Sequence, residues 1–275
     1  MEHLGGCVVS WVRRQARNRG ETIARTIAIV NQKGGVGKTT TAVNLAAGLA
    51  LAGHPTLLVD LDPQGNATTG LGVDKASLQS TVYHALVVGE TAEKARKDTV
   101  LAGLQLLPSD IDLVGAEIEL VGMERREYRL RTALAEVSSG YNYVIIDCPP
   151  SLGLLTINSL VAADRVMVPL QCEFYALEGL SHLLKTVKLV KERLNPGLRV
   201  VGIVLTMFDG RTSLALQIRN EVQQYFPGEI LETVIPRNVR LTEAPSYGRP
   251  VMLHDLRSQG AIAYLELTAE ILKHE

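Results

Sequence analysis

The chain alternates short β-branched, apolar runs with longer stretches whose apolar positions follow a helical period. Parallel strands joined by crossover helices produce this alternation. The short runs predict strands at residues 26–31, 56–61, 104–108, 143–147, 165–169, 200–206 and 230–235. The clearest helices are predicted at residues 38–52, 129–138, 177–194, 213–225 and 259–273. The pattern therefore predicts an α/β fold, a doubly wound, mostly parallel sheet with helices on both faces.

A glycine-rich loop joins the first predicted strand to the first predicted helix, where residues 31–40 read Asn-Gln-Lys-Gly-Gly-Val-Gly-Lys-Thr-Thr. Its glycines let successive backbone N–H groups point inward, and the helix N-terminus adds partial positive charge. In a P-loop of this kind, Lys38 reaches the β- and γ-phosphates and the Thr39 hydroxyl binds Mg²⁺. Gln32 stands where the usual P-loop has Gly, and a second lysine opens the loop. The predicted nucleotide-binding residues are Lys33, Gly34, Gly35, Val36, Gly37, Lys38, Thr39 and Thr40.

Two of the predicted strands end in carboxylates. Asp60 and Asp62 follow one apolar run, and Asp147 follows another. Ligands of a doubly wound sheet lie beyond the carboxyl ends of its strands, so these side chains should converge on the glycine loop. There Asp62 and Asp147 can organise Mg²⁺ and water. A lone aspartate at a strand end is more often a turn or helix cap, but the combination with the loop predicts a phosphoryl-transfer site.

Composition limits the classes of function. The chain has 275 residues, 46% of them hydrophobic and 21% charged, which suits one large domain, placed here at residues 25–275. The chain has a net charge of −1, whereas a dedicated nucleic-acid binder is usually strongly basic, so any DNA contact must be local. Residues 1–24 form a basic extension, for which we expect no stable structure. The apolar runs fall short of a membrane span, and the three cysteines, none closely paired, indicate a reduced, cytoplasmic protein.

The loop at residues 33–40 resembles the deviant Walker A loop of the ParA/MinD family of ATPases. The resemblance covers nearly the whole chain from about residue 25 onward. Three further blocks carry it, at residues 60–66 with the following Gly-Leu-Gly of 70–72, at residues 147–158 and at residues 235–250. The last block is similar to the chromosomal ParA, or Soj, branch in particular.

This resemblance implies an ATPase that requires ATP and Mg²⁺. It implies that Lys33 reaches across a dimer interface to the partner's nucleotide. It also implies that Asp62 positions or activates the attacking water and that Asp147 holds Mg²⁺ through water. Pro236 and Asn238 are the implied adenine contacts. The implied catalytic residues are Lys33, Lys38 and Asp62. The implied Mg²⁺ ligands are Thr39, Asp62 and Asp147.

The family also implies partners and a biological role. Members of this branch form an ATP-sandwiched homodimer, bind double-stranded DNA without sequence preference, and hydrolyse ATP when a ParB-type centromere-binding partner stimulates them. Arg211 and Arg240 match positions that the family uses for DNA. We therefore expect a cytoplasmic, nucleoid-associated ATPase, slow without its partner, that segregates chromosomes or plasmids.

Alternative functions remain at this stage. A MinD-like membrane-associated ATPase shares the loop, but residues 265–275 place acidic groups on the polar positions of the last helix, and anionic lipids would repel them. An iron-sulfur protein of the nitrogenase iron-protein type would need bridging cysteines, which Cys148 and Cys172 do not match. A nucleotide-dependent dimeric scaffold without hydrolysis is disfavoured by the presence of both Asp62 and Asp147.

Overall fold

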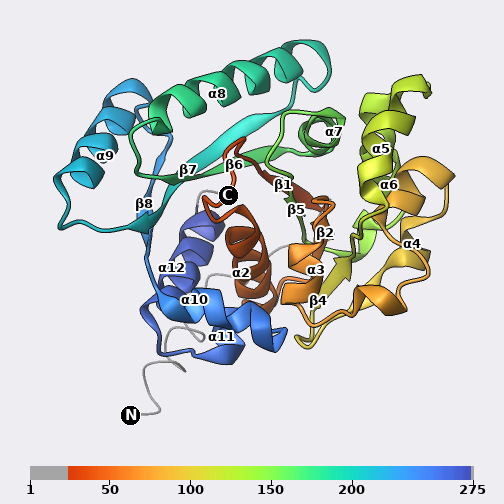
Figure 1. Ribbon diagram of the computed structural model, residues 1–275, viewed down its shortest axis with the longest axis horizontal. Helices are drawn as coiled ribbons and strands as arrows, with labels where there is room; N and C mark the ends of the chain where they lie inside the picture. The colour runs from red at the N-terminus through yellow and green to blue at the C-terminus, as the bar shows by residue number, and fades with distance from the viewer. Residues whose placement is uncertain (1–23, 274–275) are drawn as a thin grey trace.

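An eight-stranded sheet runs through the part of the chain that the computed structural model describes, residues 24–273 (Figure 1). The order of its strands is β3-β4-β2-β5-β1-β6-β7-β8, and each neighbouring pair is parallel except β3 and β4. The basic extension predicted at residues 1–24 lies outside the described residues, apart from Ala24. The strands are β1 (Arg25–Ile29), β2 (Thr56–Asp60), β3 (Lys97–Asp98), β4 (Leu104–Leu107), β5 (Tyr143–Asp147), β6 (Arg165–Gln171), β7 (Arg199–Phe208) and β8 (Ile230–Pro236).

The seven strands predicted from the apolar runs are all present, and the mostly parallel α/β arrangement is confirmed. Sequence reasoning missed β3, because its two residues, Lys97 and Asp98, carry no apolar run and only pair with the outer edge of β4. It also ended the strand predicted at 165–169 too early: β6 continues to Gln171, which pairs with Thr206 of β7. Pairing between strands, which the sequence does not show, sets these ends.

Helices cover both faces of the sheet and enclose two separate cores (Figure 1). Alternate residues of β1 face opposite cores, Ala28 one and Ile27 with Ile29 the other. None of the helices in residues 24–273 has both the length and the apolar character needed to cross a bilayer. The first face carries α5 (Leu113–Glu119), α6 (Arg129–Ala135), α7 (Leu154–Ala162), α8 (Ala176–Arg193) and α9 (Ser213–Tyr225). The second carries α2 (Lys38–Leu51), α3 (Asn66–Gly70), α10 (Val239–Glu243), α11 (Val251–His254) and α12 (Gln259–Lys273), and the short α4 (Ala92–Ala95) precedes β3.

All five predicted helices are present, although α6 ends at Ala135 rather than residue 138. The short helices α3, α4, α5, α7, α10 and α11 were not predicted. Most of them have fewer than eight residues, so periodicity gives them little signal.

The P-loop helix α2 is fixed by close packing against α12. Most of its residues are buried, and its small side chains let the two helices approach. A Cβ atom added at Gly48 would overlap the Thr268 hydroxyl and lie 3.1 Å from the Thr268 Cβ. Two turns nearer the start of α2, the hydroxyls of Thr41 and Tyr264 lie 3.1 Å apart in a buried hydrogen bond. This packing sets the position of the N-terminus of α2, and hence of the loop before it.

We expect Gly48→Val to lower the free energy of unfolding by about 1–3 kcal/mol, since the added atoms overlap Thr268 in a buried contact. Denaturant titration measures the change. Gly140→Val is the matched control, because an added Cβ there meets nothing within 4 Å, and its effect should stay within about 0.5 kcal/mol. Equal stabilities for the two variants would contradict the packing argument.

Candidate nucleotide-binding site

The glycine loop connects β1 to α2 at the carboxyl edge of the sheet. Gly37 adopts a left-handed conformation (φ 87°) that other residues rarely tolerate, and α2 begins at the next residue. The loop is held from outside by β7, where the Thr206 hydroxyl donates a 2.8 Å hydrogen bond to the Val36 carbonyl. At its start, the Lys33 N–H donates to the Asn31 side chain at 3.0 Å. The sequence therefore forms the predicted cradle, with a helix N-terminus pointing into it.

Lys38 is the central charge of this cradle. Its side chain is buried, and its ammonium group donates to the Lys33 carbonyl at 2.9 Å. Burial lowers the pKa of Lys38, while the nearby carboxylates of Asp147 and Asp62 act in the opposite direction. A lysine in such a position is stabilised as a cation by any further negative charge that enters the site.

Two carboxylates lie side by side at the ends of neighbouring strands, because Asp60 of β2 pairs in register with Asp147 of β5. Asp60 has its own partners: the Thr68 N–H and hydroxyl each donate at 2.7 Å, and the Asp62 N–H donates at 3.3 Å. Burial nevertheless raises the pKa of Asp60 to about 6. Asp60 therefore orders the loop that carries Asp62, rather than facing a ligand itself.

Asp147 is held differently. Both of its carboxylate oxygens are buried, and within residues 24–273 neither has a hydrogen-bond partner. Burial raises the pKa of Asp147 well above its usual range, and the Asp60 carboxylate adds to this effect, while the nearby Thr39 hydroxyl and Lys38 ammonium oppose it. A buried acid with both oxygens unsatisfied, near a threonine hydroxyl and a lysine, fits the donor set of a divalent cation held by oxygen ligands.

Asp62 lies at the mouth of the same site. Its Oδ1 accepts the Gln64 N–H at 2.9 Å, and its backbone carbonyl accepts the Ser109 hydroxyl at 2.8 Å. These contacts fix the loop around Asp62, whose side chain lines the cavity. The three aspartates thus take different positions, with Asp62 on the cavity wall and the Asp60–Asp147 pair beneath it.

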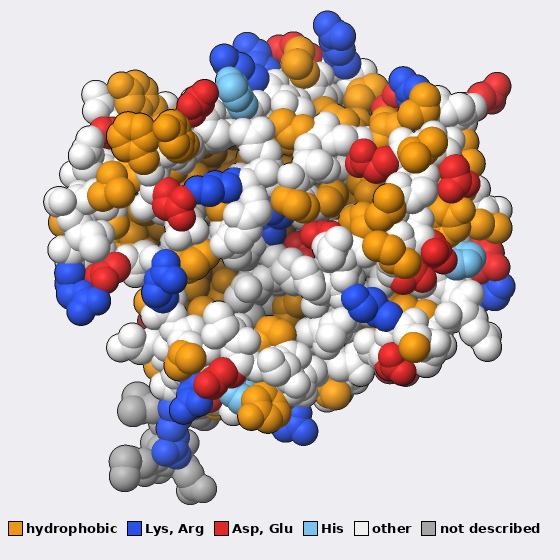
Figure 2. All heavy atoms as spheres, in the orientation of Figure 1, with side chains coloured by type: hydrophobic (Ala, Val, Ile, Leu, Met, Phe, Trp, Pro, Cys, Tyr) orange, Lys and Arg blue, Asp and Glu red, His pale blue; other side chains and the backbone are white. Residues whose placement is uncertain are grey.

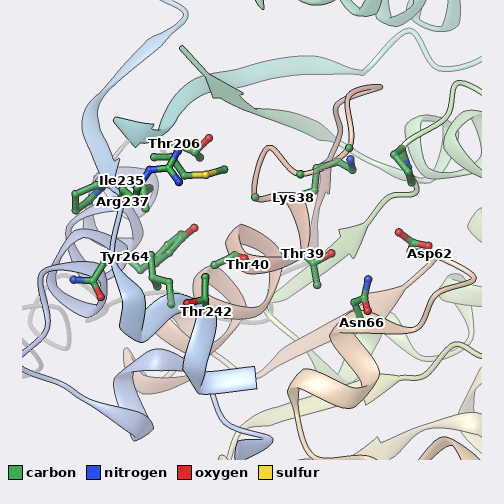
Figure 3. Close-up of a pocket in the computed structure, with 18 of the residues that line it drawn as sticks. Lys38, Thr39, Thr40, Asp62, Asn66, Thr206, Ile235, Arg237, Thr242 and Tyr264 are labelled. Atoms are coloured by element: carbon green, nitrogen blue, oxygen red, sulfur yellow. The ribbon is translucent and has the colours of Figure 1, made fainter. Parts of the chain in front are cut away.

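The cavity between these elements has a volume of about 460 Å³. Figure 3 shows the glycine-loop side, with Lys38, Thr39 and Asp62, facing a second wall that includes Thr242 and Tyr264. The predicted base-contact residues Pro236 and Asn238 lie on that second wall, at the end of β8 and before α10. Other wall residues were not predicted: Gln64, Asn66, Pro150, Thr206, Met207, Ile235, Arg237, Leu241, Thr242 and Tyr264.

Some of these residues left a signal in the sequence. Thr206 ends a predicted strand, and polar groups at strand ends of a parallel sheet line ligand sites. Tyr264 left none, because its ring fits the apolar pattern of α12. Its buried hydroxyl bonds to Thr41, and burial raises the pKa of Tyr264.

The remaining predicted residues lie on the surface, each paired with a carboxylate of its own chain. Lys33 forms an ion pair with Glu173, in the loop before α8. Arg211 forms two bonds to Asp209, of 2.8 and 2.7 Å, and the guanidinium lowers the pKa of Asp209 to about 2.

Arg240 lies between two acids, with Glu243 at 2.7 Å and Asp255 at 3.3 Å. It lies in the first turn of α10, where the Asn238 side chain accepts the Arg240 N–H at 3.0 Å. The structure thus brings the phosphate and base candidates together and leaves Lys33, Arg211 and Arg240 outside the cavity.

Comparison with known proteins identifies the family. A family model described as an AAA domain matches residues 24–200. The chain is 53% identical to the chromosome partitioning protein ParA of Myxococcus xanthus, covering 94% of this chain and 93% of the relative. It is 56% identical to the sporulation initiation inhibitor protein Soj of Bacillus subtilis, covering 90% and 98%. The chain belongs to the ParA/Soj family of chromosome-partitioning proteins.

A solved structure with a bound nucleotide adds to this comparison. Cobyrinic acid a,c-diamide synthase from Mycobacterium smegmatis, with a bound ATP analogue and magnesium, superposes with a TM-score of 0.79. It is 40% identical and covers 90% of this chain and 93% of its own. The P-loop fold of this ParA/Soj family member is thus shared with a protein that holds a nucleotide and a divalent cation.

We expect Asp147→Asn to raise the thermal midpoint of the nucleotide-free ParA/Soj protein by a few degrees, because it removes a buried carboxylate that no described residue pairs. Burial raises the folded-state pKa of Asp147, so its protonated form favours folding and wild-type stability falls as the pH rises through that pKa. The advantage of the variant should therefore widen as the pH rises from the ordinary carboxyl range toward the raised pKa of Asp147.

Thermal unfolding followed across this pH range provides the measurement. Asp112→Asn, at an exposed position, is the control and should show no such widening. A difference between Asp147→Asn and wild type that stays constant with pH would refute the assignment.

Proposed function

We propose that this chain is a DNA-partitioning ATPase that binds ATP and Mg²⁺, dimerises around the nucleotide, binds DNA and is released from it after hydrolysis. The observation that carries the proposal is the cavity in which the glycine loop, Lys38 and Asp62 meet above Asp147, whose buried oxygens no described residue satisfies. Curated relatives at 53% and 56% identity, named ParA and Soj, support the partitioning role.

The phosphates would lie against the backbone N–H groups of residues 34–40 and the N-terminus of α2, with Lys38 on the β- and γ-phosphates. Adenine would lie against Pro236 and Asn238, which line the opposite wall. The cavity of about 460 Å³ is within the range for a small-molecule ligand of this size.

Thr39, Asp62 and Asp147 would hold Mg²⁺, which when bound neutralises charge on the phosphate oxygens. Asp62 would position the attacking water, since it lies on the cavity wall with its loop fixed by Gln64 and Ser109. In phosphoryl transfer, orientation of the water and electrostatic stabilisation supply most of the rate enhancement.

Lys33 would act on the nucleotide of a second subunit. Its partner within the chain, Glu173, is about as exposed as Lys33 itself, with side chains 42% and 45% accessible. An exposed pair of this kind contributes at most about 1 kcal/mol. The Lys33 ammonium could therefore leave Glu173 at little cost and bind the phosphates of the nucleotide in the second subunit. Loss of the γ-phosphate after hydrolysis would release it.

DNA would contact the dimer through Arg211 and Arg240. Both guanidinium groups are exposed and pair with exposed or half-buried carboxylates. Phosphates of DNA can replace those carboxylates, and release of counterions drives such binding. Dimerisation doubles the number of arginines, so a chain of net charge −1 can hold DNA when ATP joins two copies.

The protein would thus work in the cytoplasm, on the nucleoid, with slow hydrolysis until a ParB-type centromere-binding partner accelerates it. The deciding experiment is co-sedimentation with non-specific duplex DNA in ATP, ADP or no nucleotide, at fixed salt. Retention only with ATP, increased by Asp62→Ala, supports the proposal. Absence of DNA binding in every nucleotide state would remove the DNA role.

Lys33→Ala should retain ATP binding to within about threefold but lose the ATP-dependent dimer, because the cis phosphate contacts come from Lys38 and the loop backbone. Nucleotide titration and size-exclusion chromatography with light scattering, both with Asp62→Ala to prevent turnover, measure the two properties. Lys185→Ala, an exposed lysine of α8, should behave as wild type. Normal dimerisation of Lys33→Ala would disprove the trans contact.

Arg211→Ala combined with Arg240→Ala should weaken DNA retention about tenfold at moderate salt while ATP binding stays unchanged, because neither side chain lines the cavity. The slope of log affinity against log salt should fall by about 1 for each DNA phosphate that the variant no longer neutralises. Arg131→Ala, at an exposed position of α6, is the matched control. An unchanged salt slope in the double variant would count against these arginines.

A further inference from the structure

A turn at residues 62–65 carries Asp62 at the mouth of the nucleotide cavity, and we call it the Asp62 turn. The Gly65 N–H closes it by donating to the Asp62 carbonyl at 2.8 Å. Within it, the Gln64 N–H donates to the Asp62 carboxylate at 2.9 Å. Figure 3 shows Asp62 and Asn66 on the side of the cavity where Thr39 lies. The direction of the Asp62 side chain therefore depends on how the peptide groups of this turn are oriented.

Lys75 holds the Asp62 turn from outside the cavity. Its ammonium donates to the Gln64 carbonyl at 2.7 Å, so Gln64 binds Asp62 through its N–H and Lys75 through its carbonyl. The aliphatic part of the lysine lies over Gly65, which has a left-handed backbone (φ 59°). A Cβ atom added at Gly65 would lie 2.9 Å from both the Lys75 Cδ and the Ser109 carbonyl oxygen. The turn is thus enclosed between this lysine and the backbone at Ser109.

The backbone that carries Lys75 is fixed on its own account. The lysine is the first residue of a short 3-10 helix, η1 (Lys75–Ser77). The Asp74 carboxylate caps this helix by accepting the Ala76 N–H at 3.0 Å. Just before it, the backbones of Gly72 and Gly248 are in contact, since a Cβ atom added at Gly248 would lie 2.6 Å from the Gly72 Cα. The Lys75 side chain therefore extends to the Asp62 turn from an anchored position.

Lys75 is not itself part of the cavity wall. Its side chain is exposed, and it is absent from the described residues that line the cavity. Figure 2 shows the molecule hollowed at the middle of this face, with Lys and Arg side chains at the surface around the hollow. The partner of the Lys75 ammonium is a backbone carbonyl, and a hydrogen bond from a charged donor is stronger than one from a neutral donor. Its contribution is to the conformation of the backbone next to Asp62.

We propose that Lys75 is a positioning residue for ATP hydrolysis, which keeps the Asp62 turn in the conformation that directs the Asp62 carboxylate at the attacking water. This inference rests on the proposed function, in which Asp62 positions that water. Without the ammonium, the Gln64 carbonyl would bind water, and the peptide group before Gly65 would rotate more freely, because glycine has the widest conformational range. Orientation of the nucleophile supplies much of the rate in phosphoryl transfer, so hydrolysis would slow.

Two other roles for this lysine lead to different expectations. A lysine that contacted the nucleotide would raise KM for ATP when removed, but Lys75 lies away from the cavity wall. A lysine that only stabilised the fold would change the unfolding midpoint and leave kcat unaltered wherever the protein is folded. A positioning role lowers kcat and leaves ATP affinity unchanged.

The kinetic test compares Lys75→Met, which keeps the aliphatic chain and removes the ammonium, with wild type in a phosphate-release assay. We expect kcat to fall about threefold to tenfold and KM for ATP to stay within about twofold. Lys75→Arg should recover at least about half of the wild-type kcat, because its guanidinium also donates hydrogen bonds. Lys94→Met is the matched control, since Lys94 is also exposed and donates to Glu90 at 2.7 Å, and should keep the wild-type kcat.

An equal kcat in Lys75→Met and wild type would overturn the positioning role, as would a raised KM with kcat unchanged. An equal loss of kcat in Lys94→Met would also overturn it, because removal of any exposed lysine would then have the same effect. No recovery of kcat in Lys75→Arg would count against the hydrogen bond to Gln64.

A second test does not require turnover. Hydrogen exchange followed by mass spectrometry on the nucleotide-free protein reports on the N–H groups of Gln64 and Gly65, which both donate to Asp62. Lys75→Met should raise exchange in the peptide that spans the Asp62 turn at least about threefold, with α12 unchanged. Unchanged exchange would refute the contact as a constraint on the turn. Raised exchange in a protein whose wild type hydrolyses no ATP would instead contradict the proposed function and leave this constraint intact.

Discussion

The site depends on two carboxylates buried side by side at the carboxyl edge of the sheet. In-register pairing of β2 and β5 puts Asp60 next to Asp147, and burial raises both pKa values. Buried charges of like sign are tolerated only with hydrogen bonds or a cation close by. Asp60 uses Thr68 and so fixes the loop of Asp62, whereas no residue of the described chain satisfies the oxygens of Asp147, near Lys38. Burial of the unsatisfied Asp147 carboxylate thus lowers the free energy of unfolding, and the same carboxylate is placed to bind a cation.

A second feature is the way the surface cations are held. Lys33, Arg211 and Arg240 each pair with a carboxylate of their own chain, in contacts open to solvent. Such exposed ion pairs contribute little free energy, so these side chains can leave their carboxylates and bind other anions. Phosphate groups, which also accept charge-assisted hydrogen bonds from guanidinium and ammonium, can take the place of these carboxylates. This would suit the proposed function, in which contacts with DNA and with a second subunit form and break.

Helix α5 connects the surface to the catalytic edge. Its inner side packs Leu113 and Ala116 into a core, while Glu117 contacts the start of α7 and Ser109, just before it, bonds to the Asp62 loop.

The sequence by itself determined seven strands, the five clearest helices, the glycine loop and the strand-end aspartates, because these follow from local periodicity and from residue types at fixed spacing. Other features required tertiary structure. Thr206 and Tyr264 line the same cavity as the glycine loop only because β7 and α12 pack beside it. Nor does the pattern around α5, apolar on two sides, reveal which side is buried. Strand order, ion pairing and exposure depend on contacts between distant segments, and local periodicity carries no information about those contacts.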